Sequence, residues 1–547
     1  MQAFTFILIL VMAVVASQPL TRLFRIVPLP IVQIALGAAL AWPTAGFHPK
    51  IEPELFLLLF IAPLLFADAW EAPKREYRKL MRPILSLAFG LVFFTTLVCG
   101  FALHWLVPSM PLPVAFALAA ALSPTDAVAV SSIVDKERVP KNLMHILEGE
   151  SLLNDASGLV VFRFATAAAL TGSFSLWQAS LAFIFAVVGG AAAGLLAVAV
   201  VTGALKLLAK SDRIAPEAQV LVIVFLPFVA FLAAEAVHAS GVLAAVVAGV
   251  AAGHTRTARQ LSVSVYMLTH SFWVMLAFLL NGAIFVLLGL QLPAIIRTIP
   301  PALTDTHRLW QPLGIIVALT FCLIALRFLW ISVAIALSRL AARRFRLEQF
   351  RTTLRTRLAG SVAGVRGAVT LAGVLSLPVL ALDGSPFPGR DVAIFLAVGV
   401  ILLWLAIASL GLPPIVRGLV VGHGAVHAIE MRRARIAATE AAIARLESVT
   451  HRGGADGTAT IEQAVAEGLI AAYRRRLALL EDGQTPREEV AALQSAENAL
   501  RQTALAAERE ALRDLLKRGE IDDVAFNVLA HELVLHDVLA ETKTKSH

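Results

Sequence analysis

The chain has 547 residues, of which 58% are hydrophobic and 15% are charged, and its formal net charge is +8. Soluble globular proteins contain about 45–50% apolar residues, so this composition excludes an ordinary soluble protein and indicates an all-α protein with many membrane spans. The basic residues lie mostly in loops between apolar segments, so the positive charge is not interpreted as a nucleic-acid interface.

About thirteen apolar segments are interpreted as spans, because ~20 helical residues cross the ~30 Å hydrocarbon core of a bilayer. They are residues 3–20, 27–45, 54–71, 82–107, 112–134, 142–171, 176–209, 217–238, 240–254, 263–292, 311–341, 356–381 and 389–419. The first is followed by PLTRLFR without a small-residue cleavage pattern, which favours a retained span over a signal peptide. Basic residues gather in alternate loops, such as 74–82 and 339–357. The positive-inside rule then places the N-terminus outside and the C-terminal tail in the cytoplasm.

The third segment, 54–71, carries a carboxylate within an apolar sequence. Pro63 should bend this span, and Asp68 lies deeper than Glu71, which is close to the cytoplasmic interface. A carboxylate at this position either reaches an ion inside the protein or extends its side chain to the membrane surface. The residues alone leave both interpretations open.

The segment 112–134 is interrupted near its middle by the sequence SPTD, Ser123 to Asp126. Pro124 removes a backbone donor and clashes with the preceding turn, so the helix should unwind there. Unwound backbone at membrane depth is tolerated only inside the protein or along an aqueous cavity, and such breaks are typical of ion sites in transporters. We therefore expect Thr125 and Asp126 to lie at such a site.

The next segment, 142–171, places polar groups on one helical stripe. Ser151, Asn154, Asp155 and Gly158 follow one another at positions i, i+3, i+4 and i+7. A carboxylate at the centre of a span costs at least ~2.5 kcal/mol, so Asp155 is interpreted as functional. A structural carboxylate that is hydrogen-bonded between helices remains the alternative for Asp155 and, more strongly, for Asp126.

Two arginines stand within later apolar segments. An isolated Arg327 in FCLIALRFLW would be costly, so a buried partner is expected. Arg366 is flanked by Gly364 and Gly367, which should give its head group room to reach carbonyls at a helix break. The two cysteines, Cys99 and Cys322, lie in apolar runs without a His/Cys cluster, which argues against a disulfide framework and a zinc site.

The composition changes after about residue 420, where charged amphipathic helices replace the apolar runs. We expect residues 420–547 to form a separate soluble helical tail, with a glycine linker at residues 453–457. Its apolar faces need a partner, which is either another helix of the tail or a second copy of the chain.

GESLLND (149–155) after an unwound SPTD resembles the sodium/proton exchanger family, in its NhaP-like bacterial branch. Further matching stretches run in family order over residues 1 to about 420. They are PLLFADAW (63–70), SGVLAAVVAG (240–249), CLIALR (322–327) and GVRGAVTLAG (364–373). The resemblance implies a homodimer whose protomers have a dimerisation unit and a core of six helices with inverted repeats. It also implies a second broken helix, within 364–373, that crosses the first near the membrane midplane.

The resemblance also implies roles for individual residues. Asp155 would hold either a proton or Na⁺, with Ser151 and the Thr125 carbonyl as further oxygen ligands. Asp126 would act through water or by neutralising helix ends, and Asp68 would be a peripheral ligand. Glu150 faces another side of the helix from Asp155, and the resemblance implies that it forms a structural ion pair with Arg327.

A neutral side chain, Asn154, stands where electrogenic relatives carry a second Asp, so the resemblance implies electroneutral one-for-one exchange without a cofactor. K⁺/H⁺ exchange is the nearest alternative, because oxygen ligands alone do not fix the size of the cation. An intramembrane hydrolase with Asp126 and Asp155 as paired carboxylates is another, although no GxGD sequence is present. A membrane sensor that signals through the tail is the third. At position 281 the chain has an asparagine where eukaryotic exchangers commonly have an acidic residue. This difference leaves open whether Asn281 helps to attract ions.

Overall fold

The computed structural model describes residues 2–23, 27–42, 53–134, 139–172, 176–209, 215–253, 263–297, 310–345, 353–417, 419 and 423–450, with short pieces of 466–518. The chain divides into two compact units, Met1–Val421 and Gly422–His547. The change in composition at about residue 420 lies near this boundary. The first unit carries the apolar segments, and each unit is described by itself below.

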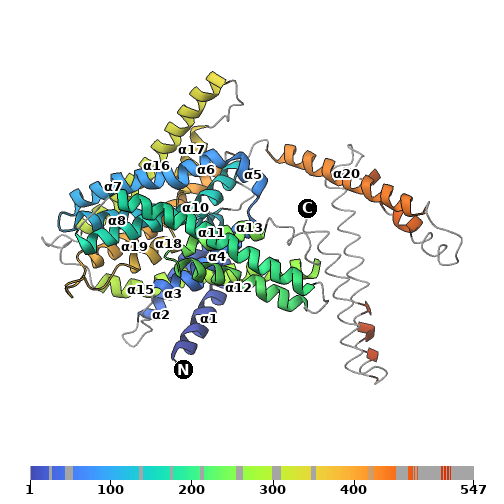
Figure 1. Cartoon of the computed structure of the whole chain (residues 1–547), viewed down its shortest axis with the longest axis horizontal. Helices are drawn as coiled ribbons and strands as arrows, with labels where there is room; N and C mark the ends of the chain where they lie inside the picture. Colours follow the sequence, from blue (N-terminus) through green and yellow to red (C-terminus); the bar gives the residue numbers. More distant parts are fainter. Residues whose placement is uncertain are drawn as a thin grey trace. The chain divides into compact units, whose positions relative to one another are not determined.

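Helices account for nearly all of the described part of the first unit (Figure 1). The early helices are α1 (Gln2–Leu23), α2 (Leu29–Ala41), α3 (Pro53–Phe56), α4 (Ala62–Glu71), α5 (Lys74–Lys79), α6 (Met81–Leu85) and α7 (Val92–Leu106). The π-helical turns η1 (Leu57–Ile61) and η2 (Ser86–Leu91) join α3 to α4 and α6 to α7. The next are α8 (Leu112–Leu122), α9 (Ala127–Ile133), α10 (Lys141–Thr171), α11 (Leu176–Ala209) and α12 (Pro216–Glu235). The last are α13 (Gly241–Ala252), α15 (Val263–Arg297), α16 (Trp310–Phe345), α17 (Leu354–Val362), α18 (Ala368–Leu375) and α19 (Arg390–Arg417).

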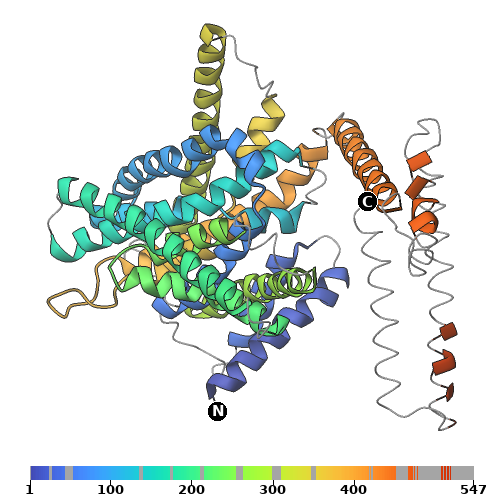
Figure 2. The ribbon, with the colours of Figure 1, turned by 45° about the vertical axis from the view of Figure 1, so that its right-hand side comes forward.

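Every segment expected to span the membrane coincides with one of these helices or with a broken helix. By length and composition, seven described helices can cross a membrane singly, and the α8–α9 pair, bent by 49°, makes an eighth. The apolar helices α2 and α13 have only 13 and 12 residues, and each packs against a longer helix, α15 and α11 respectively. The all-helical multi-span fold is confirmed. The C-terminal part of α16 projects away from the other helices (Figure 2).

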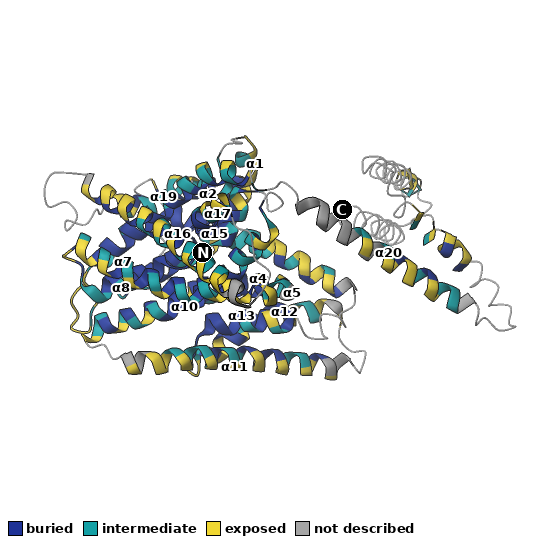
Figure 3. Cartoon of the chain, turned by 90° about the horizontal axis from the view of Figure 1, so that it is seen from above, coloured by how far each residue is buried: buried dark blue, intermediate teal, exposed yellow. Residues whose placement is uncertain are grey.

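Apolar side chains also cover the outer surface of this unit. The helices α1 and α11 have only 22% of their most apolar windows buried, and exposed residues run along the length of α11 (Figure 3). Among them are Ile7 and Met12 on α1 and Ile184 and Phe185 on α11. Contiguous apolar surface of this extent is unfavourable in water but suits contact with lipid tails. These helices therefore fit the lipid-facing side of a membrane protein.

The interior is organised around separate apolar clusters. The largest draws mainly on α7–α10 and α16–α19. Two others draw mainly on α1, α2, α4, α11, α12, α13 and α15. This division matches the expected core of six spans, broken helices included, beside a second group of helices. We call the first group the core layer and the second the scaffold layer.

The second unit contains α20 (His423–Thr450) and shorter helical pieces. Arg474 donates a hydrogen bond to Glu447 of α20 at 2.7 Å, so another part of the tail is a partner of this helix. The glycine linker expected at residues 453–457 lies outside the described residues.

Candidate ion-binding site

Two broken helices meet in the core layer. The first break is Ser123–Asp126, between α8 and α9, and the second is Ala363–Gly367, between α17 and α18. The backbone N–H of Asp126 donates to the Val365 carbonyl at 2.7 Å. The Arg366 guanidinium donates to the carbonyls of Ser123 and Pro124 at 2.8 and 3.0 Å. The second break is thus present, and each unwound segment satisfies backbone groups of the other inside the protein.

Asp126 caps the half-helix that follows it. Its carboxylate Oδ1 accepts hydrogen bonds from the N–H groups of Val128 and Ala129, at 2.9 and 3.0 Å. The same carboxylate lies against Gly367, the residue just before α18, so closely that any Cβ there would overlap it. A negative charge near helix N-termini is favourable, because the unpaired N–H groups carry partial positive charge. Asp126 is therefore placed to stabilise the N-terminal ends of α9 and α18.

Arg366 is buried, and its guanidinium lies 4.6 Å from the centre of the Trp404 ring. It reaches the carbonyls of the first break, as expected. The Arg327 side chain occupies the space beside Gly364, and the Asp126 carboxylate occupies the space beside Gly367. Because glycine has no Cβ, both positions admit a side chain from another segment close to the backbone of the second break.

Helix α10 presents its polar stripe to the first break. Asn154 is fully buried, and its Nδ2 donates to the Thr125 hydroxyl at 2.9 Å. That hydroxyl donates in turn to Glu150 at 3.3 Å, and the Ser151 hydroxyl accepts from the N–H of Ala127 at 3.4 Å. The Thr125 side chain thus links α10 to the first break.

Glu150 and Arg327 form an ion pair in which both side chains are about 1% exposed. Arg327 donates to both carboxylate oxygens, with Nη2 at 2.7 Å from Oε2, and its Nε donates to the Gly360 carbonyl at 2.8 Å. Such a two-pronged contact between guanidinium and carboxylate fixes geometry as well as charge. The pair connects α10 with α16 and α17 beside the second break.

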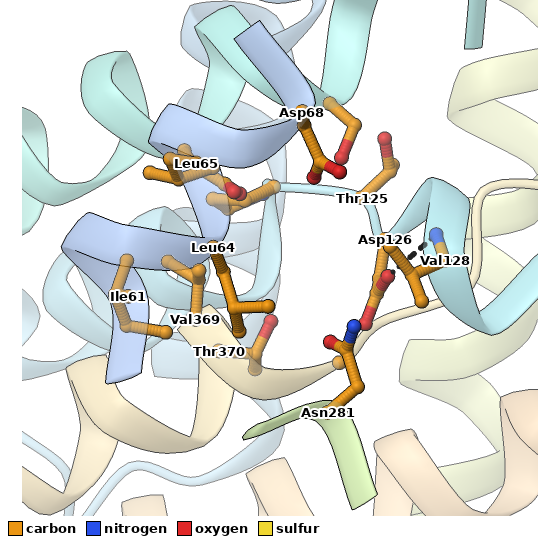
Figure 4. Close-up of a pocket in the computed structure, with 14 residues that line it drawn as sticks. Ile61, Leu64, Leu65, Asp68, Thr125, Asp126, Val128, Asn281, Val369 and Thr370 are labelled. Carbon is orange, nitrogen blue, oxygen red and sulfur yellow. Dashed lines mark hydrogen bonds between the residues drawn. The ribbon is translucent and has the colours of Figure 1, made fainter. Parts of the chain in front are cut away.

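A cavity lies between the two layers. Its volume is about 40 Å³, measured as the space open to the centres of water molecules. This exceeds the ~10–15 Å³ that one water molecule requires. Its lining is Ile61, Leu64, Leu65, Asp68, Pro124, Thr125, Asp126, Val128, Ser151, Asp155, Asn281, Gly367, Val369 and Thr370. Ile61, the last residue of η1, and Leu64 and Leu65 of α4 form a largely apolar side. Asp126 and Asn281 face each other in the lower part of the view (Figure 4).

The cavity brings together five of the expected site residues: Asp155, Ser151, Thr125, Asp126 and Asp68. Asn154 does not line it and lies behind Thr125. Asp68 reaches the cavity from the scaffold layer. Thr370 was missed by the sequence analysis, because a threonine within an apolar helix carries no local signal of function. Asn281 was noted only as a departure from relatives, although a lone amide in an apolar span is itself a signal.

Comparisons with known proteins agree with this architecture. The family described as sodium/hydrogen exchanger, transmembrane, matches residues 6–418. The chain is 39% identical to the uncharacterized Na⁺/H⁺ exchanger YjcE of Escherichia coli, covering 98% of this chain and 99% of that protein. It is 36% identical to a sodium, potassium, lithium and rubidium/H⁺ antiporter of Bacillus subtilis, covering 97% of this chain and 77% of the relative.

A solved structure shares the fold. The sodium proton antiporter MjNhaP1 from Methanocaldococcus jannaschii superimposes with a TM-score of 0.55 at 18% identity, covering 77% of this chain and 98% of that chain. The sequence match spans all the helices that form the two breaks, the Glu150–Arg327 pair and the cavity. The chain therefore belongs to the sodium/hydrogen exchanger family, whose members are membrane transporters.

Proposed function

We propose that Asp155 is the group that carries either a monovalent cation or a proton, and that Na⁺ is the preferred cation. The observation that carries this proposal is the position of Asp155, a buried carboxylate that lines the cavity between the two layers. A charged carboxylate in such a place needs a counter-ion or a proton. Because it cannot hold both at once, binding of one releases the other, and this competition couples their opposite movements without a nucleotide.

The neighbouring oxygens suit a hard cation. The Ser151 hydroxyl and the Thr125 carbonyl supply ligands next to Asp155, and Asp68 approaches the same cavity from α4. Asp126 is committed to the N–H groups of α9. We therefore assign it mainly to the helix ends rather than to direct ion binding. Glu150, Arg327 and Arg366 hold the helices that carry these ligands.

Transport requires that the site open alternately to each side of the membrane. The cavity lies between the core layer and the scaffold layer, so movement of one layer against the other would change which side it faces. We place the protein in the bacterial inner membrane, with the N-terminus outside and the tail in the cytoplasm, from the basic loops. A homodimer, implied by the family resemblance, would use part of the apolar outer surface of the scaffold layer.

K⁺/H⁺ exchange is the second candidate, and it is favoured by the potassium named for the B. subtilis relative. The hydrolase alternative is disfavoured, because one oxygen of Asp126 accepts two backbone hydrogen bonds and would be a poor general acid or base.

Cation-dependent proton movement tests the proposal directly. In inverted membrane vesicles with an imposed pH gradient, addition of Na⁺ should dissipate the gradient, as read by recovery of the fluorescence of a pH-gradient dye. K⁺ and Li⁺ are added separately to rank the cations. A response to K⁺ at lower concentration than to Na⁺ would assign the second candidate. No response to any of the three, with the protein present and folded in the vesicles, would overturn exchange altogether.

The charge balance of the cycle gives a separate prediction. If Asp155 is the only titrating carrier and Asn154 stays neutral, one cation moves for one proton. The final ion gradient should then be independent of an imposed membrane potential. If the charges moved in the two directions were unequal, each net charge moved per cycle would change the driving force by ~2.3 kcal/mol per 100 mV. Exchange is measured in proteoliposomes with and without a K⁺-diffusion potential. A steady-state gradient that follows the potential would require a second proton carrier, with Asp126 and Asp68 the first to test.

A further inference from the structure

The cavity contains a hydroxyl group that the exchange mechanism above does not use. Thr370 lies in the first turn of α18, after the second break, and lines the cavity together with Asp155 (Figure 4). Its side chain is about 1% exposed, and its Oγ1 has no hydrogen-bond partner within the described structure. A buried hydroxyl without a partner is costly, so its presence needs an explanation.

Threonines in helices usually avoid this cost by donating to the carbonyl four residues earlier. Thr95 of α7 and Thr320 of α16 do so, each at 2.7 Å. For Thr370 the corresponding carbonyl belongs to Arg366, within the unwound segment, and no such bond forms. The break therefore leaves the hydroxyl of Thr370 uncommitted beside the cavity.

We propose that Thr370 Oγ1 is a ligand of the transported cation and helps to set its affinity. The inference rests on the proposed function of Asp155. A hydroxyl oxygen is a hard ligand, as are the carboxylate, hydroxyl and carbonyl oxygens of Asp155, Ser151 and Thr125. Those three come from α10 and the first break, whereas Thr370 comes from the half-helix after the second. The bound cation is then held by both crossing helices.

The electrostatics of this position are compatible with a cation. The N-terminal end of α18 carries partial positive charge, which alone would repel a cation. The Asp126 carboxylate lies against Gly367 at this same end and offsets that charge. Thr370, three residues further on, can therefore present its oxygen to a cation close to a helix N-terminus.

Removal of the hydroxyl at constant shape tests the inference. Thr370→Val replaces Oγ1 by a methyl group of similar size, and Thr370→Ser keeps the oxygen. Loss of one ligand to a charged group should raise the apparent KM for Na⁺ about tenfold in Thr370→Val, equivalent to ~1.4 kcal/mol. Thr370→Ser should stay within about twofold of the original protein. Because the hydroxyl has no partner among the described residues, Thr370→Val should melt at or above the temperature of the original protein without Na⁺.

Thr269→Val is the matched control, because Thr269 is equally buried and its hydroxyl also has no partner in the described structure, but it does not line the cavity. The control should leave the KM for Na⁺ unchanged. Na⁺-dependent thermal stabilisation gives a readout of binding besides turnover, and Thr370→Val should need about tenfold more Na⁺ for half of the effect. An unchanged KM and Na⁺ requirement in folded Thr370→Val would overturn the inference. Failure of the original protein to exchange any cation would instead overturn the proposed function.

Discussion

Asp155→Asn is expected to abolish exchange while leaving a folded, inserted protein. Asparagine has nearly the shape of aspartate but cannot take up a proton at physiological pH, and it carries no charge to balance a cation. It also removes the cost of a buried carboxylate, so loss of folding is not expected. The initial rate of Na⁺-induced recovery of the dye signal should fall to that of vesicles without the protein.

Asp391→Asn is a suitable control for this substitution. Asp391 lies in the first turn of α19, and its side chain is 77% exposed, whereas the side chain of Asp155 is buried. Its removal should leave the exchange rate unchanged. Cation-dependent proton flux that persists in Asp155→Asn would move the carrier role to another carboxylate of the cavity, and Asp68→Asn would be the next variant to measure.

Glu150→Gln and Arg327→Met should each lower the stability of the protein strongly. Each leaves the other member charged and unpaired in a site where both side chains are about 1% exposed, at an expected cost of ~3–5 kcal/mol. The midpoint of thermal unfolding in detergent, measured for each variant, tests this. The effect on exchange should follow the amount of folded protein, because neither side chain lines the cavity.

The double variant separates the ion pair from the other contacts of Arg327. Removing both charges should recover part of the loss, because no unpaired charge remains. Recovery should be incomplete, since the Gly360 carbonyl still loses its donor. Single effects that simply add in the double variant would contradict a direct coupling of the two side chains.

Local patterns were sufficient for much of the fold. Apolar runs of the length that crosses a bilayer predicted the helical, multi-span fold, since each run reports the environment of its own residues. Pro124 predicted the first break, because proline disrupts the helix in which it stands. The spacing of Ser151, Asn154 and Asp155 predicted a shared stripe, because helical periodicity fixes which residues lie on one face. The Glu150–Arg327 pair was reached only through family resemblance, although the cost of a buried arginine indicated that some partner exists.

Only the tertiary structure decided which residues pack against the polar stripe of α10. The second break contains no proline, and it is stabilised by contacts such as that between Arg366 and the Ser123 carbonyl, 243 positions away in the chain. The side chains that fill the space beside Gly364 and Gly367, those of Arg327 and Asp126, were also decided by the tertiary structure, because a glycine in a sequence does not reveal what packs beside it. Thr370 and Asn281 line the cavity because α18 packs against α10 and α15 packs against α18. Periodicity shows which face a residue occupies, whereas its partner depends on packing between helices far apart in the sequence.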